Sequence, residues 1–120
     1  MRNPIFLTLN IFATVLTMAV SILILIDPAF ALPADTEVTT GVTTFARACS
    51  IRSLAVGAAL LLALARHSRA TAITLLYATA VIQAGDATVH LLNANPASAA
   101  ATTLAALALT SAHWLTRRPE

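Results

Sequence analysis

Apolar residues fill four long stretches of the chain, and short polar segments separate them. The first stretch, residues 5–26, is uncharged and rich in Ile, Leu, Val and Phe; the others are residues 45–65, 70–92 and 97–115. At 1.5 Å per residue, a helix of about 20 residues crosses the roughly 30 Å hydrocarbon core of a membrane. The pattern therefore predicts an all-α fold, a bundle of four transmembrane helices that forms a single membrane domain over residues 1–120.

The connecting segments have the composition of turns. Residues 27–44 combine two prolines, three acidic residues, a glycine and five threonines with no basic residue, so we expect the longest loop there. It is a solvated connector or, alternatively, a lid over the bundle. Residues 66–69 and 93–96 are the other two turns.

The first stretch admits a second interpretation, because Ala29-Phe30-Ala31 resembles the cleavage site of a secretory signal peptide. The apolar core of a signal peptide is usually about 7–15 residues long, and residues 5–26 exceed that length. Asp27 would also lie close to the cut. We expect a retained first helix, with cleavage within residues 1–31 as the alternative.

Composition excludes a soluble domain. Hydrophobic residues make up 58% of the chain and charged residues 10%, and the mean hydropathy is +0.84, whereas soluble domains average about 45–50% and 25%. All seven basic residues are Arg, and they are spread along the chain, so no nucleic-acid partner is expected. The single Cys49 excludes an intramolecular disulfide, and we interpret it as a small packed residue. No cofactor is expected.

The loop and terminal arginines predict the orientation. In a four-span topology they all fall on one side, and the acidic loop falls on the other. Basic residues favour the cytoplasmic side, so both termini should be cytoplasmic in an integral membrane protein, at the plasma membrane if the source is prokaryotic. The arginines concerned are Arg2, Arg66, Arg69, Arg117 and Arg118.

Ionisable side chains inside the second and third apolar stretches predict a polar site. Arg52 lies about seven residues from the outer end of its helix and Asp86 about six from the outer end of the next, which places both about 10 Å below the outer boundary. The two side chains can therefore meet, and Arg47 lies level with His90. An unpaired charge at such a depth costs about 2.5–3.5 kcal/mol, which pairing relieves.

At 100° per residue, Gln83, Asp86 and His90 project within about 60° of one another and form a polar stripe that should face the bundle interior. In one interpretation Arg52 and Asp86 lock two helices in register. In the other, the stripe lines a pocket open to the outer side, where Asp86 and His90 exchange protons or bind a ligand and the arginines hold an anion. One His and one Asp are too few ligands for a metal, so no metal is expected.

Two segments carry a resemblance to a known family: residues 45–57 (FARACSIRSLAVG) and 83–87 (QAGDA). They resemble the small four-helix membrane proteins of domain-of-unknown-function family 4267, which are similar to the wider DoxX-like group. In that family the second helix typically has an Arg, then Gly-(Ile/Ala)-Arg-Asp-Leu and a later Gly, and the third has a Gly-Asp step. The matching residues are Arg47, Ile51, Arg52, Leu54, Gly57, Gly85 and Asp86.

The chain departs from that pattern at two positions, because Ser50 replaces the Gly and Ser53 replaces the Asp. The second departure removes one carboxylate, which weakens any mechanism that needs two. Residues 27–33 also match the Pro-containing end of the family's first helix, so the resemblance covers nearly the whole chain and disfavours cleavage. It implies a four-helix membrane bundle and no established activity.

The leading functional hypothesis is a membrane protein with a buried Arg52–Asp86 pair that lines a small pocket on the outer side and binds a lipophilic molecule. The alternative is a membrane-embedded isomerase or cyclase that acts on an apolar substrate, with Asp86 as general acid, His90 as base or orienting group, and Arg47 and Arg52 stabilising negative charge. A third hypothesis is a subunit or small transporter that works as a homo-oligomer. The expected partners are the lipid bilayer, a lipophilic small molecule and further copies of the chain.

Overall fold

Four helices make up almost all of the computed structural model, which describes residues 3–117. The elements are α1 (Pro4–Ile26), the short 3-10 helix η1 (Pro28–Ala31), α2 (Thr40–Ala65), α3 (Arg69–Leu92) and α4 (Ala97–Arg117). The all-α, four-helix prediction is confirmed. Arg2 and Arg118, which contributed to the predicted orientation, lie outside the described residues.

The predicted loop over residues 27–44 is too long, because α2 begins at Thr40. The side-chain oxygen of Thr39 accepts a hydrogen bond from the Val42 amide at 3.2 Å and so caps the helix. The Thr44 hydroxyl donates to the Thr40 carbonyl at 2.8 Å, inside the first turn. The composition of this segment suggested a loop, but its threonine side chains form hydrogen bonds with backbone groups in the first turn of α2.

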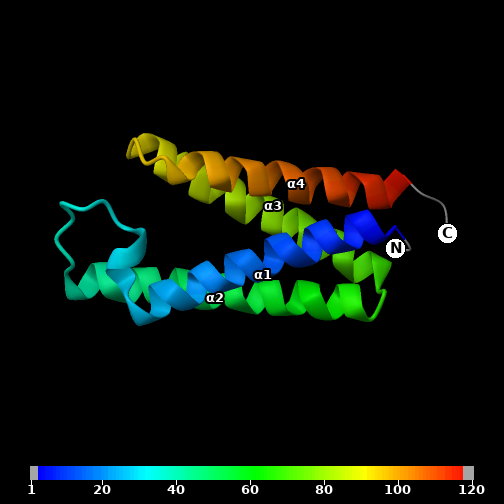
Figure 1. Cartoon of the computed structure of the whole chain (residues 1–120), viewed down its shortest axis with the longest axis horizontal. Helices are drawn as coiled ribbons and strands as arrows, with labels where there is room; N and C mark the ends of the chain where they lie inside the picture. The colour runs from blue at the N-terminus through cyan, green and yellow to red at the C-terminus, as the bar shows by residue number, and fades with distance from the viewer. Residues whose placement is uncertain (1–2, 118–120) are drawn as a thin grey trace.

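The helices are arranged as two pairs, α1 with α2 and α3 with α4, and contacts of α2 with α3 and of α1 with α4 close the ring. Figure 1 shows that the pairs converge where α1 begins and α4 ends, and diverge toward η1 and the α3–α4 turn. We call these the closed end and the open end of the bundle. The α2–α3 turn also lies at the closed end, as the four-span topology requires.

The core lies toward the closed end. Phe6 of α1 stacks on Trp114 of α4 with ring centroids 4.8 Å apart. The Arg69 guanidinium donates to the carbonyl of Leu115 at 3.1 Å from Nε, which ties the start of α3 to the end of α4. The buried apolar cluster consists of Phe6, Leu60, Ala63, Leu64, Ala72, Leu76, Ala80, Ala108, Ala112 and Leu115.

Three helices of the described chain, α1, α2 and α3, are long and apolar enough to cross a membrane. Large apolar side chains of α1 point outward: Ile5 is 70% exposed and Phe12 67%, as expected for lipid contact. By length and composition the chain is therefore a helical membrane protein. The fourth helix is richer in Ser and Thr and does not meet the same criterion, so its crossing of the membrane stays a prediction.

Candidate functional site

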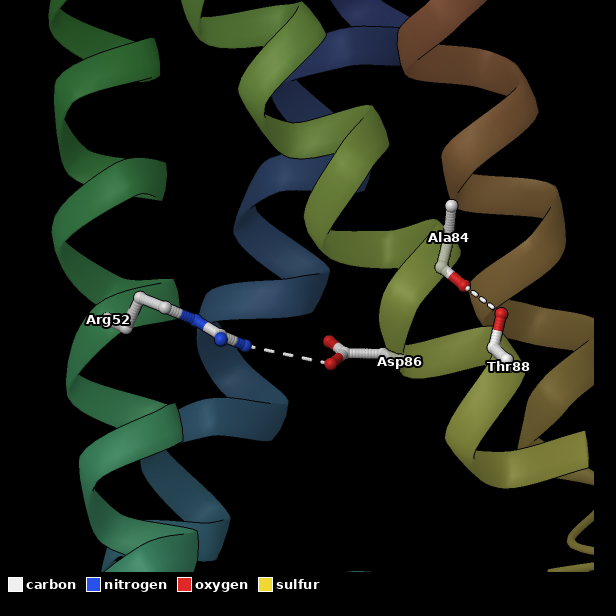
Figure 2. Close-up of polar contacts among 4 residues, drawn as sticks. All are labelled: Arg52, Ala84, Asp86 and Thr88. Atoms are coloured by element: carbon white, nitrogen blue, oxygen red, sulfur yellow. Dashed lines mark hydrogen bonds and ion pairs between the residues drawn. The ribbon is translucent and has the colours of Figure 1, made fainter. Parts of the chain in front are cut away.

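The structure brings Arg52 of α2 and Asp86 of α3 together across the bundle. An Nη2 atom of Arg52 lies 3.6 Å from Oδ1 of Asp86, and Figure 2 shows the two side chains extended toward each other across the space between their helices. The two side chains therefore meet, as expected from the sequence, although the depth argument assumed that α2 begins at residue 45 and it begins at Thr40.

The pair is not buried, which corrects the prediction. The side chain of Arg52 is 47% exposed and that of Asp86 is 41% exposed. The reason is the divergence of the helix pairs, since α2 and α3 stand apart at this level and the two side chains span the gap between them (Figure 2). An ion pair of this exposure and length contributes little to stability, about 0–1 kcal/mol.

The predicted polar stripe on α3 is only partly directed inward. Gln83 is 7% exposed and faces the interior, whereas Asp86 and His90 are partly exposed. Arg47 is exposed, and within residues 3–117 the side chains of Arg47 and His90 form no hydrogen bond or ion pair. The structure thus joins Arg52 to Asp86 and does not draw Arg47 or His90 into the same contact.

A small cavity lies between all four helices, next to the ion pair on the side of the closed end. Its volume is about 40 Å³, which is room for about three water molecules or one small polar group. Ser53, which follows Arg52, and Gln83, one turn before Asp86, both line it. Its polar lining residues are Asn10, Thr14, Thr17, Ser53, Thr79 and Gln83.

Sequence reasoning missed four of the six polar residues that line this cavity: Asn10, Thr14, Thr17 and Thr79. Asn10 donates through Nδ2 to the Phe6 carbonyl at 2.9 Å and to Ser111 Oγ at 3.0 Å; as the one amide side chain within the first apolar stretch, it could have been noticed. Thr79 is one of many helical threonines, and nothing in the sequence distinguishes it. The space at Ser53, where the resemblance leads to an Asp, is also part of this cavity.

The arrangement offers a charge pair in the gap and a neutral, hydrogen-bonding cavity beside it. In the described part of the chain, no three His, Cys, Asp or Glu side chains come together as a metal site. Asp86 and His90 lie one turn apart on α3 without a hydrogen bond between their side chains, and the ion partner of Asp86 is Arg52.

These features define a small helical membrane protein with a polar site between diverging helices. The chain belongs to the family described as Domain of unknown function (DUF4267), whose model matches residues 13–116. No curated protein and no solved structure matches the chain. A relation to the DoxX-like group stays a prediction.

Proposed function

We propose that the protein binds a small lipophilic molecule in the gap between α2 and α3. The observation that carries this proposal is the half-exposed Arg52–Asp86 pair at the point where two apolar helices diverge. Charged groups at membrane depth face a water-filled or protein-lined space, because hydrocarbon cannot solvate them. An amphiphilic molecule can contact both the charged pair and the apolar helix surfaces, with its polar group near the pair and its apolar part against the helices.

The distribution of charge supports access from the outer leaflet. Arg66 and Arg69 lie at the closed end, whereas the loop that holds Asp35 and Glu37 lies at the open end (Figure 1). With basic residues inside, the open end faces outward and both termini are cytoplasmic. In a Cys49→Ser background, the thiol introduced by His67→Cys should react with a membrane-impermeant maleimide only in inverted vesicles, and reaction in right-side-out vesicles would contradict this orientation.

A retained first helix also supports the proposal. Asn10, Thr14 and Thr17 of α1 line the cavity beside the ion pair, and the matched family region includes residues 13–31. Cleavage near residue 31 would remove that wall of the cavity. Isomerase or cyclase chemistry at Asp86 and His90 has no additional observation in its favour, so we do not extend the proposal to catalysis.

Photolabelling tests the proposal. The full chain in lipid nanodiscs is irradiated with photoreactive palmitic acid or photoreactive cholesterol, and labelled residues are mapped by mass spectrometry. We expect saturable labelling of α2 and α3 around the gap, competed by the unmodified lipid. Ser53→Phe should abolish it by filling the space next to Arg52, whereas Ala59→Phe, at an exposed position of the same helix, should leave it unchanged. Labelling that never saturates and is equal in both variants would refute binding.

A further inference from the structure

Thr79 differs from the other threonines of the helices. Its hydroxyl is buried and has no hydrogen-bond partner within the described residues. Helical threonines commonly donate to the carbonyl four residues earlier, and eight here do so: Thr14, Thr17, Thr44, Thr74, Thr88, Thr102, Thr103 and Thr110. The Thr79 hydroxyl therefore remains available to a group outside the helix.

Gln83 stands one turn further along α3, on the same face. Its side chain is 93% buried, from a relative exposure of 7%, and within residues 3–117 its amide makes no hydrogen bond. Thr79 and Gln83 both line the central cavity. The buried Thr79 hydroxyl carries a free-energy cost because it lacks a partner, and a hydrogen-bonding group in the cavity that also contacts the Gln83 amide would remove that cost.

The residues that line the cavity favour a neutral hydrogen-bonding group over a charged one. Among residues 3–117 no charged side chain lines the cavity, and most of its other lining residues are apolar. Thr79 supplies one O–H donor and Gln83 an NH₂ donor, and a carbonyl oxygen with two lone pairs can accept from both. A carboxylate or ammonium group would be left without a counter-charge there, since Arg52 and Asp86 lie outside the lining.

We propose that the lipophilic ligand is a neutral carbonyl compound whose oxygen accepts hydrogen bonds from Thr79 Oγ1 and Gln83 Nε2, with its apolar chain leaving through the gap beside the Arg52–Asp86 pair. This inference rests on the proposed function and specifies its ligand class. A volume of about 40 Å³ holds a carbonyl group but not the whole of a lipophilic molecule, so the apolar part must lie outside the cavity.

The test compares two probes of one carbon skeleton, 2-tridecanone labelled with ¹³C at the carbonyl and n-tridecane, with the full chain in nanodiscs. Binding is followed by the melting curve of the single tryptophan and by the ¹³C resonance of the ketone. We expect the ketone to bind at least about five-fold more tightly than the alkane, as for one or more buried neutral hydrogen bonds. Its carbonyl resonance should shift downfield on binding.

Thr79→Val and Gln83→Leu should each weaken ketone binding about five-fold and leave alkane binding unchanged. Neither should lower the melting temperature of the ligand-free protein, because each removes a buried group without a protein partner. Thr74→Val is the matched control, since Thr74 is exposed on α3 and its hydroxyl donates to Ala70; it should change neither binding nor shift.

Three results would overturn the inference. If the alkane binds as tightly as the ketone, the gap binds lipophiles without this contact, and the proposed function survives alone. If neither probe binds while photolabelling still saturates, the ligand is of another class, and again only the inference falls. If Thr79→Val destabilises the ligand-free protein and spares ketone binding, the cavity holds structural water only.

Discussion

Different interactions connect the helices at the two ends of the bundle. The closed end joins all four helices through an apolar cluster, the Phe6–Trp114 stack and the Arg69 contact with Leu115. Toward the open end the helix pairs diverge, and the gap is spanned by the half-exposed pair of Arg52 and Asp86. The architecture therefore concentrates packing at one end of the bundle and leaves polar groups accessible toward the other.

This division separates most of the apolar core from the half-exposed ion pair, although Leu60, Leu76 and Ala108 of the core also line the cavity. A site that must admit a molecule from the bilayer needs helices that can stand apart, and tight packing of small and large side chains would prevent that. With the core at the opposite end, a change in the gap need not disturb the helix pairing. Substitutions at each end, and at the boundary between them, test whether the closed end contributes more to stability than the open end.

The largest effect is expected in the closed end. Leu64→Ala removes a side chain that is 1% exposed and should lower the free energy of unfolding by about 2–3 kcal/mol, mainly through the cavity it leaves. Reversible unfolding in mixed micelles, followed by tryptophan fluorescence, measures the loss. Leu62→Ala on the same helix is the control, because Leu62 is 50% exposed. Equal losses for both would show that the closed end is not the structural core.

A smaller effect is expected at the boundary, where α1 approaches α2. A Cβ atom at Gly57 would lie 2.7 Å from Cγ and 2.9 Å from Sδ of Met18, so Gly57→Ala forces Met18 to move and should cost about 1–2 kcal/mol. Adding Met18→Ala should recover part of that loss. Gly85→Ala is the control, since a Cβ there meets nothing within 4 Å. A Gly57→Ala protein as stable as the wild type would mean that α1 and α2 are not in close contact.

The smallest effect is expected at the open end. A double-mutant cycle of Arg52→Gln and Asp86→Asn should give a coupling free energy below about 1 kcal/mol, with all three proteins folded, because the pair is half-exposed. The same unfolding assay measures it. If each single change unfolds the protein and the double change restores it, the pair locks the fold and the contrast between the two ends fails.

The sequence predicted the helices because their signals are local. The predicted bounds of α3 and α4 lie within two residues of the observed ones. They followed from the runs of apolar residues and from the turns at 66–69 and 93–96. The contact of Arg52 with Asp86 was predicted from depth, but the depth of Arg52 was counted from residue 45, whereas α2 begins at Thr40. The early start of α2 was missed, since a cap by Thr39 and the bond from Thr44 to Thr40 are side-chain choices that composition does not reveal.

The exposure of the candidate site could not be predicted in the same way. Whether two helices stay in contact or diverge depends on packing summed over the whole bundle, and the periodicity of α3 alone suggested a fully inward stripe. Gln83 does face inward, while Asp86 and His90 do not follow it. Thr79 matters only because its hydroxyl, unlike those of Thr74 and Thr88, has no carbonyl partner.

The hydrogen bond between Asn10 and Ser111 has a consequence for biosynthesis. It joins residues 101 positions apart, one in α1 and one in α4, so α1 is synthesised well before its partner. Each helix pair can form as a hairpin soon after it is translated, but one of the two hydrogen bonds donated by the Asn10 amide must wait for α4. Closure of the bundle between α1 and α4 therefore follows the formation of the helix pairs, and a bundle without α4 would leave the Asn10 amide with its bond to the Phe6 carbonyl alone.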